Sequence, residues 1–294
     1  MSKNFPAPKV ILITGTSSGF GMLTAARLAS SGHHVFATMR DLAKKDLLLA
    51  EVKKRGGKLN LLPLDVTSRE SMQSVVAMIA ESFGYLDVLI NNAGYGLGGF
   101  FEDLTEEEIR RQMETNFFGV QNVTRQAIPL LRSRKAGKIL NISSIAGLQS
   151  SPCFGAYNAS KWALEGFTES LRYELKFFGI DVFLIEPGTY KTKIFHENAQ
   201  YAKNFFNPSS PYYHLSQRLY TKIMNYLDQC RRDPEEVAIL IEKLIMAQNP
   251  PFRNIPDSQT RWHSRVKRWL PFSIYSWIVW KILFNEVKKP DEET

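Results

Sequence analysis

VILITGTSSGFG, at residues 10–21, joins a short apolar run to a glycine-rich turn, and an Ala- and Leu-rich segment follows. This order predicts a buried strand, a tight turn and the start of a helix. Glycines let the backbone approach a ligand closely, and the N–H groups of a helix N-terminus can bind a pyrophosphate. The spacing GxxxGxG differs from the GxGxxG fingerprint and from a P-loop, since no Lys-Ser/Thr pair follows the glycines. A plain strand-to-helix turn is the alternative, but it needs fewer glycines, so we predict a nucleotide site. Its predicted residues are Gly15, Ser17, Ser18, Gly19, Phe20 and Gly21.

The rest of the chain repeats this alternation of short apolar runs and longer amphipathic segments. Continuous apolar runs suit strands that are buried on both faces of a parallel sheet. We therefore predict the α/β class, with a doubly wound parallel sheet (Rossmann fold) and right-handed crossovers. No linker-like composition divides the chain, so residues 1–294 are expected to form a single domain. Within it we expect a core over about 8–250, a substrate lid over about 189–232 and a C-terminal extension over about 251–294. The further predicted strands are 35–37, 59–64, 88–90, 139–142 and 182–185.

Two helix starts can be read from capping patterns. Thr67 with Glu70 and Thr105 with Glu108 have the spacing of a capping box. Gly84 is expected to end the first of these helices, because glycine adopts the left-handed conformation at a helix C-terminus.

Composition limits the class of protein. The chain has 294 residues with ordinary apolar and charged fractions, which excludes disordered and collagen-like proteins. Cys153 and Cys230 are the two cysteines, so a reducing, cytoplasmic location is expected and no metal site is implied. Residues 1–9 show no signal peptide. The net charge of +8 allows nucleic-acid binding, but no such motif accompanies it. Solvated basic side chains and an anionic cofactor explain it better, so no nucleic-acid partner is expected.

A proton-transfer site is indicated by Tyr157 and Lys161, which share one helix face at a spacing of four residues. A phenol has an ordinary pKa of about 10, and a neighbouring ammonium should lower this pKa. Ser144, on another segment, can donate a hydrogen bond to the reacting oxygen. The trio is typical of proton transfer to or from a carbonyl or alcohol, and it requires a hydride donor.

The end of the second strand bears on the identity of that donor. A carboxylate there would accept from the ribose 2′-hydroxyl of NAD. The chain instead reads Met39-Arg40-Asp41, and a guanidinium suits a phosphate. We therefore predict NADP(H) rather than NAD(H), with Arg40 on the 2′-phosphate. The alternative is that Asp41 pairs with Arg40.

Several motifs in the same order resemble the short-chain dehydrogenase/reductase family over roughly residues 8–250. Within this family the chain is similar to the 17β-hydroxysteroid dehydrogenase/retinol dehydrogenase-like branch, on the segment ATMRD at 37–41 and on the C-terminal extension. The motifs are TGTSSGFG at 14–21, Asp65-Val66, Asn91-Asn92-Ala93-Gly94, Asn116, Ser144, Tyr157-Asn158-Ala159-Ser160-Lys161, and Pro187-Gly188 with Thr192.

The resemblance implies a role for each matching residue. Tyr157 would be the general acid/base, Lys161 would lower its pKa and hold the nicotinamide ribose, and Ser144 would stabilise the substrate oxygen. Asn116 would hold a water of the proton relay. Two alternatives stay open: Ser143 competes with Ser144, and Asn116 could instead mark a helix kink. The other implied cofactor contacts are Asp65 and Val66 at the adenine, Asn91, Ala93 and Gly94 near the ribose, and Pro187, Gly188 and Thr192 at the nicotinamide.

The expected function is an NADP(H)-dependent oxidoreductase that interconverts a ketone or aldehyde and an alcohol on a lipophilic substrate such as a steroid, retinoid or lipid. A 3-oxoacyl thioester reductase is a second hypothesis, and a non-catalytic NADP(H)-binding sensor or scaffold is a third. A homodimer is expected from the resemblance.

Two segments concern the substrate and possible partners. Aromatic side chains of the lid either line an apolar pocket or pack onto the core; they are Phe195, Phe206, Tyr213 and Tyr220. His214 is expected at the surface rather than on a distal polar group, and Cys153 either faces the pocket or packs in a loop. Residues 251–294 join basic residues to an apolar, Trp-rich stretch. This extension could contact a membrane interface peripherally, cover the pocket mouth or meet a partner subunit.

Overall fold

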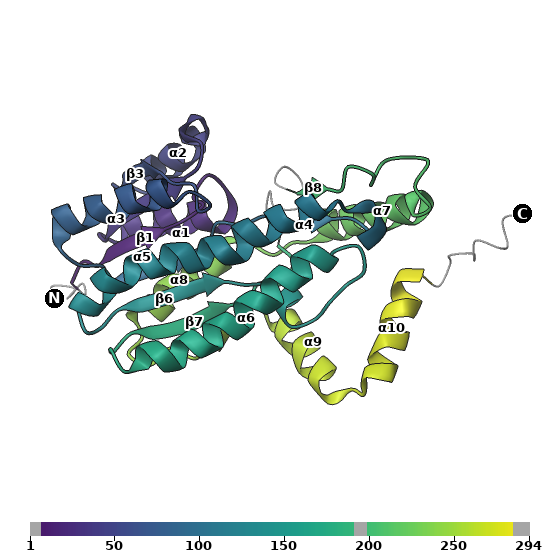
Figure 1. Ribbon diagram of the computed structural model, residues 1–294. Coiled ribbons are helices and arrows are strands. Elements are labelled where there is room, and N and C mark those ends of the chain that lie inside the picture. The colour runs from purple at the N-terminus through teal and green to yellow at the C-terminus, as the bar shows by residue number, and fades with distance from the viewer. Residues whose placement is uncertain (1–6, 191–198, 285–294) are drawn as a thin grey trace, which may run out of the picture.

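The computed structural model describes residues 7–190 and 199–284 and is built on one parallel sheet (Figure 1). The strand order is β3-β2-β1-β4-β6-β7-β9, and every neighbouring pair is parallel. The order reverses between β1 and β4, so their carboxyl ends form the crevice where such sheets bind ligands. The strands are β1 (Val10–Ile13), β2 (His34–Met39), β3 (Asn60–Pro63), β4 (Val88–Asn91), β6 (Lys138–Ile142), β7 (Asp181–Ile185) and β9 (Arg253–Asn254).

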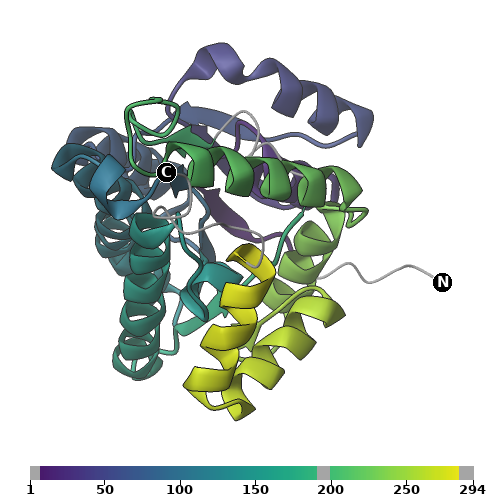
Figure 2. The same ribbon diagram turned by 90° about the vertical axis from the view of Figure 1, so that its right-hand side faces the viewer.

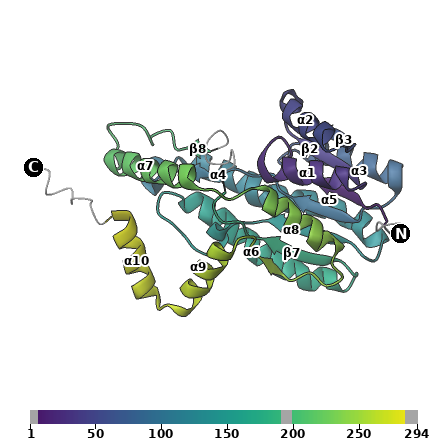
Figure 3. The same ribbon diagram turned by 180° about the vertical axis from the view of Figure 1, so that it is seen from behind.

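Helices cover both faces of the sheet, which confirms the predicted doubly wound class. In Figure 1 the helices α3 (Arg69–Phe83), α5 (Gly119–Ser133) and α6 (Gly155–Lys176) lie in front of the sheet. Figure 3, from behind, shows α1 (Gly19–Ser30) and α8 (Glu235–Met246) on the other face. The helix α2 (Asp46–Lys54) packs beside α1.

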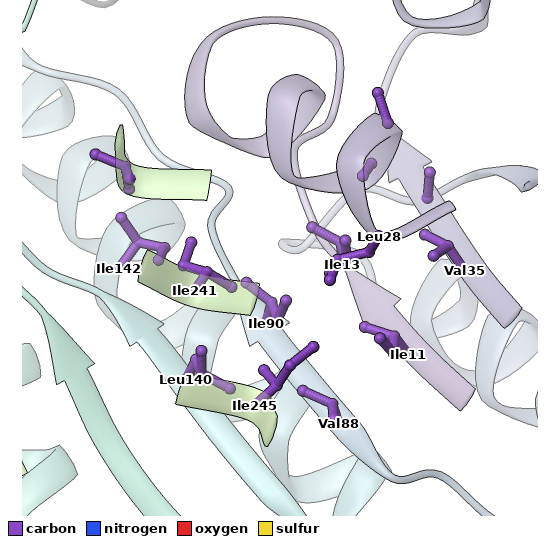
Figure 4. Packing of buried hydrophobic residues seen from close by; sticks show 14 of the residues in the cluster. Ile11, Ile13, Leu28, Val35, Val88, Ile90, Leu140, Ile142, Ile241 and Ile245 are labelled. Carbon is purple, nitrogen blue, oxygen red and sulfur yellow. The ribbon is translucent and has the colours of Figure 1, made fainter. Parts of the chain in front are cut away.

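Two apolar layers hold the sheet between these helices. Figure 4 shows one of them, in which Ile11 and Ile13 of β1 meet Leu28 of α1, and Ile241 and Ile245 of α8 meet the neighbouring strands. The other layer joins α3, α5 and α6 to the opposite face. All four residues of β1 are buried, which is why the strand reads as a continuous apolar run.

Local chemistry sets the helix ends, with one correction to the sequence analysis. Thr105 and Glu108 form the predicted capping box at the start of α4 (Glu106–Met113). The helix α3 begins one residue later than predicted, because the Ser68 hydroxyl accepts from the backbone N–H of Ser71. Thr67 instead donates its hydroxyl to a neighbouring carboxylate. Gly84 ends α3 with φ 72°, as predicted.

Shorter elements lie at the carboxyl end of the sheet. The strands β5 and β8 form a separate two-stranded parallel ladder. The helix α7 (Tyr213–Gln229), green in Figure 2, crosses in front of the sheet in that view. After β9 the chain forms α9 and α10, two helices that make a V projecting from the body (Figure 1). The bounds are β5 (Leu97–Gly98), β8 (Gln200–Tyr201), α7 (Tyr213–Gln229), α9 (Ser258–Trp269), α10 (Phe272–Phe284), the 3₁₀ turns η1 (Leu42–Lys44), η2 (Phe101–Asp103) and η4 (Ile145–Gly147), and the π-helical turn η3 (Glu114–Phe118).

Candidate active site

The glycine-rich turn lies against the loop that follows β4. Gly15 has φ 72°, and a Cβ on it would stand 2.6 Å from the Ala93 Cα. The Asn92 side-chain amide donates to the carbonyls of Thr14 (3.0 Å) and Gly15 (2.8 Å). The Thr14 hydroxyl accepts from the backbone N–H groups of Asn92 and Ala93, both at 3.0 Å. Asn92 and Thr14 therefore fix the two loops together, a role that the sequence analysis did not assign to them.

The start of α1 is formed by glycines, which have no side chain that would block a close approach to its backbone. Gly19 opens the helix with φ 56°, and a Cβ on Gly21 would overlap the Asn92 amide and the Gly15 carbonyl. The first turn of α1 holds no acidic residue. Bare N–H groups at a helix N-terminus suit a pyrophosphate. The predicted Ser17 and Ser18 form the turn before α1, and Phe20 faces the adjoining cavity.

Arg40 stands exposed directly after β2, where the sequence analysis placed a 2′-phosphate contact. The Asp41 carboxylate accepts from the backbone N–H of Ala43 at 2.9 Å and caps η1. In the part of the chain that the structure describes, no ion pair joins Asp41 to Arg40. The alternative of an Arg40–Asp41 pair is therefore not observed, and the contact of Arg40 with a 2′-phosphate stays a prediction.

Two further predicted positions follow β3. Asp65 accepts from the Thr67 backbone N–H (2.9 Å) and hydroxyl (2.7 Å) and orders the loop there. Val66 is buried beneath the start of α5, so close that a Cβ on Gly119 would lie 2.8 Å from it. Both residues lie at the carboxyl edge of the sheet, beside β2, where the adenine was expected.

The Asn91 side chain lies inside the protein, and the predicted contact of Asn91 near the ribose stays a prediction. Its side chain is 3% exposed and donates to Asn141 Oδ1 (2.8 Å) and Thr124 Oγ1 (3.0 Å). This side chain therefore ties β4 to β6 inside the protein. The ligand-facing positions of this loop are Asn92 and Gly94, which line the cavity.

Ser144, Tyr157 and Lys161 meet in a cavity of about 590 Å³ beside the glycine-rich turn. The Tyr157 phenol hydrogen-bonds to the Ser144 side chain. The Lys161 ammonium donates to the Ile142 carbonyl at 2.8 Å and stands 5.8 Å from the centre of the Tyr157 ring. Ser143 also lines the cavity, but its buried hydroxyl has no hydrogen-bond partner among the described residues. The structure therefore favours Ser144 over Ser143 as the partner of the phenol.

The protonation of the two groups departs from the sequence prediction. Burial raises the pKa of Tyr157, and the hydrogen bond from Ser144 offsets this only in part. Burial lowers the pKa of Lys161 to about 8, against a smaller opposing effect of the Glu165 charge. The expected lowering of the phenol pKa by Lys161 is not found, because the ammonium points to the Ile142 carbonyl and desolvation dominates. Near neutral pH the phenol is therefore protonated.

Asn116 lies on η3, the π-helical turn, and is 1% exposed. Its amide accepts from the Tyr95 N–H at 3.1 Å and donates to the Tyr95 carbonyl (3.0 Å) and the Ser160 hydroxyl (3.2 Å). Asn116 thus supports the cavity wall from behind. A π-turn interrupts a helix and is frequent at functional sites. The helix irregularity is therefore observed at Asn116, and its role with a relay water stays a prediction.

Pro187 and Gly188, which were predicted at the nicotinamide, line the cavity. A Cβ on Gly188 would overlap the Thr260 hydroxyl and come within 3.1 Å of Asp257 Oδ2, so α9 packs directly on this glycine. The predicted contact Thr192 lies outside the described residues.

A buried charge cluster stands behind this wall, and the sequence analysis missed it. Arg253 Nη1 donates to Glu165 Oε2 and Glu186 Oε1, both at 2.5 Å. Burial and the charge of Glu165 raise the pKa of Glu186 to about 8. The sequence held one signal, since Glu165 follows Lys161 by one helical turn. Its partner Arg253 is 88 residues away, and no local pattern pairs the two.

The outer wall of the cavity is apolar and comes from α7 and α10. Among the described residues it does not include Phe206, Tyr213 or Tyr220, so of the two alternatives for these side chains the pocket lining is not observed. Tyr201, Phe205, Phe206 and Tyr220 pack on one another instead. The wall residues from these helices are Leu219, Lys222, Ile223, Tyr226, Leu227, Ile282 and Leu283.

Three smaller predictions also have an outcome. His214 is exposed, as expected. Cys153 packs in the small cluster beneath β5, with φ 68°, which favours the loop-packing reading over the pocket reading. Phe195 lies outside the described residues.

Comparisons with known proteins agree with this geometry. The model of a family described as "short chain dehydrogenase" matches residues 9–203. A 3-ketodihydrosphingosine reductase of Bacteroides thetaiotaomicron is 38% identical over 275 residues, 90% of this chain and 94% of that one. Retinol dehydrogenase 8 of Homo sapiens is 37% identical over 254 residues, 84% of this chain and 81% of that one. A solved short chain dehydrogenase/reductase from Burkholderia phymatum, in complex with NAD, has a TM-score of 0.77 at 25% identity, covering 89% of this chain and 93% of its own.

Proposed function

The protein belongs to the short-chain dehydrogenase/reductase family, in its retinol dehydrogenase-like branch, and on this premise we propose that it interconverts a lipophilic ketone or aldehyde and the corresponding alcohol with NADP(H). One observation carries the proposal. A buried phenol, hydrogen-bonded to Ser144, faces an apolar cavity that adjoins a glycine-rich helix N-terminus with no acidic residue in its first turn.

The cofactor supplies or accepts the hydride when bound. The chain has residues that fit it: Gly15, Gly19 and Gly21 would hold the pyrophosphate. A Cβ on Gly15 or Gly21 would clash with Ala93 or Asn92, so glycine is needed for the close packing of this turn against the loop after β4. Lys161 would hold the ribose nearest the nicotinamide, and Pro187 would flank the nicotinamide ring.

Side chains of the protein carry out the proton transfer. The protonated Tyr157 phenol donates its proton to the substrate oxygen, while the Ser144 hydroxyl hydrogen-bonds the same oxygen. In the opposite direction the phenolate accepts the alcohol proton, and the hydrogen bond with Ser144, which opposes the rise in the phenol pKa, stabilises it. Burial keeps Tyr157 protonated near neutral pH, which is the form that donates a proton in carbonyl reduction.

Tyr157→Phe tests this mechanism. A positioned general acid contributes about 10²–10⁴-fold, so the variant should lose turnover by that factor and still bind NADPH. Turnover is followed by nicotinamide absorbance over a panel of ketones and aldehydes, and cofactor binding by fluorescence titration. Tyr173→Phe, on the exposed face of the same helix α6, is the matched control and should behave as wild type. Full turnover in Tyr157→Phe would remove Tyr157 from the mechanism.

The substrate class is proposed from the cavity wall. Leu219, Ile223 and Leu227 of α7 and Leu283 of α10 offer an apolar surface, and apolar pockets with few polar groups select lipophilic ligands. Relatives whose names refer to a sphingoid ketone and to retinol are consistent with this class. A panel that contains a long-chain ketone, a steroid ketone, a retinoid aldehyde and a 3-oxoacyl thioester separates the proposal from the thioester reductase hypothesis. If no member of the panel is turned over while NADPH still binds, the result favours the hypothesis of a non-catalytic sensor or scaffold.

NADP(H) is proposed because Arg40 stands exposed where the 2′-phosphate would lie. A hydrogen bond to a charged group contributes about 1.5–3 kcal/mol, so Arg40→Ala should reduce the preference for NADPH over NADH by roughly 10- to 150-fold. The measurement is kcat/KM for both cofactors. Lys53→Ala, an exposed cation on α2, is the control. An unchanged preference in Arg40→Ala, or a wild-type preference for NADH, would contradict the assignment.

We also propose a homodimer. Exposed aromatic side chains at the end of α6, Tyr173 and Phe177, offer an apolar surface for a second copy. Sedimentation equilibrium of the full chain measures the mass, and a monomer at micromolar concentration would contradict the proposal.

A further inference from the structure

The V formed by α9 and α10 carries much of the exposed apolar surface of the described chain. Figures 1 and 3 show both helices projecting away from the sheet. At the tip, Trp269 is 85% exposed and Phe272 is 79% exposed. Along α10, Trp277, Trp280 and Ile282 are each at least 60% exposed. A contiguous apolar surface of this kind marks an interaction site.

The charge on the V has one sign. Residues 258–284 contain no Asp or Glu, whereas five cations lie among them: Arg261, Arg265, Lys267, Arg268 and Lys281. Arg265 and Arg268 are exposed on the last turns of α9, next to the tip. The surface is thus apolar at its end and cationic at its rim.

Lys267 differs from the other cations, because it anchors the V to the body. Its ammonium donates to the Leu148 carbonyl and lies 5.4 Å from the Trp162 ring centre and 5.6 Å from that of Tyr275. The base of the V is therefore attached to the domain while the tip stays exposed.

We propose that the tip and the outer side of α10 dock on a membrane surface that contains anionic lipid. Tryptophan is enriched at membrane interfaces, and basic residues close to the surface attract anionic headgroups. A second copy of this chain fits less well, since packing two such tips would bring cations together with no carboxylate in either V. No described helix is long and apolar enough to cross a bilayer; α10, with 13 residues, is about 20 Å long and would lie in the interface.

The far end of α10 connects this surface to the cavity. Ile282 and Leu283 line the cavity, and the Lys222 ammonium of α7 donates to both of their carbonyls at 3.4 Å. An α10 that lies along the membrane would bring the rim of the cavity to the lipid surface. A lipophilic substrate would then enter from the bilayer; this one consequence rests on the proposed function.

Vesicle co-sedimentation of the full chain tests the docking. Phosphatidylcholine vesicles are compared with vesicles that also contain phosphatidylserine, at low and high salt. Binding is expected to the anionic vesicles and to weaken with salt. Arg265→Gln with Arg268→Gln should weaken it about 30-fold, at roughly fivefold per charge. Trp269→Ser with Phe272→Ser should weaken it by more than tenfold, because both side chains leave the interface.

The control removes exposed apolar surface elsewhere. Leu47→Ser with Phe101→Ser, on α2 and η2, should leave vesicle binding unchanged. Absence of binding to anionic vesicles, equal binding to neutral ones, or full binding by the tip variant would each overturn the proposal. A tip variant whose mass in vesicle-free solution differs from wild type would overturn it in favour of a protein interface. None of these measurements needs a substrate, so they fail or succeed independently of the proposed reaction.

Discussion

Replacing Gly188 by alanine is expected to destabilise the fold through the start of α9. A Cβ at this position would overlap the Thr260 hydroxyl and lie 3.1 Å from both Thr260 Cβ and Asp257 Oδ2. Thr260 and Asp257 are 6% and 8% exposed, and Asp257 caps α9 by accepting from the Thr260 N–H at 2.7 Å. The obstacle is therefore a capped helix N-terminus, which cannot move as easily as the end of a flexible side chain.

The size of the effect follows from this geometry. Overpacking a filled site costs about 1–3 kcal/mol, and we expect about 2–3 kcal/mol because the capped turn must shift as a unit. An unfolding entropy of about 2 cal/mol/K per residue gives roughly 0.6 kcal/mol/K for a chain of 294 residues. The melting temperature should therefore fall by about 3–5 °C.

Scanning calorimetry measures this shift, with two companion variants. Gly166→Ala is the control, since its Cβ meets nothing within 4 Å on the exposed side of α6. This change should stabilise the protein by about 0.5–1 kcal/mol, because alanine is the better helix former. Thr260→Ala removes the overlapping hydroxyl, so in that background the cost of Gly188→Ala should shrink by about 1 kcal/mol or more.

Two results would refute the reasoning. A Gly188→Ala protein with the melting temperature of wild type would show that α9 can move aside at no cost in stability. An equal cost of Gly188→Ala in both backgrounds would show that the strain does not arise at Thr260.

The remaining predictions concern buried charge. Burial lowers the pKa of Lys161 to about 8 from an ordinary 10.5, so its ammonium is lost as pH rises through about 8; the affinity for NADPH should fall over the same range, and a pH titration of binding that stays flat would contradict this. Below about pH 8 the buried ammonium of Lys161 lowers the free energy of unfolding. This cost disappears as pH rises from about 8 to 10.5, because in that range the unfolded chain holds more protons than the folded one. Arg253→Met leaves Glu165 and Glu186 without their cation and should cost about 3–5 kcal/mol above about pH 8, where Glu186 is ionised, measured by urea unfolding. Because burial raises the pKa of both carboxyls, part of this loss should return as pH falls below about 8; a loss that is independent of pH would contradict it.

The sheet could be predicted because its strands are buried on both faces. Each predicted apolar run is a strand in the structure, from β2 to β7. The strand β9 was missed, since two residues, Arg253 and Asn254, are too few for any periodicity. Its place is fixed by tertiary pairing with β7.

The wall of the cavity shows a different limit. Aromatic composition drew attention to Phe206 and Tyr220, but composition does not say which face of a segment meets a ligand. Leu219, Ile223 and Leu227 line the cavity at a spacing of four residues, which is the helical period. That spacing was present in the sequence and would have indicated the correct face of α7.

Residue types and spacing brought Ser144, Tyr157 and Lys161 together correctly, but they did not give the protonation of the site. The pKa of Tyr157 depends on how completely the fold removes water from the phenol and on where the Lys161 ammonium points. Both depend on contacts from distant parts of the chain, so they could not be read from a local motif.

The position of β9 limits how such a protein can be recombined with its relatives. A chimera joined at residue 250 would exchange the C-terminal helices, but it would also replace the edge of the sheet and the guanidinium that lies between Glu165 and Glu186. A junction after Thr260 would keep both, together with the fit of Thr260 against Gly188. A graft joined after Thr260 would transfer the outer helices between family members and leave the sheet and the cavity residues before this junction unchanged.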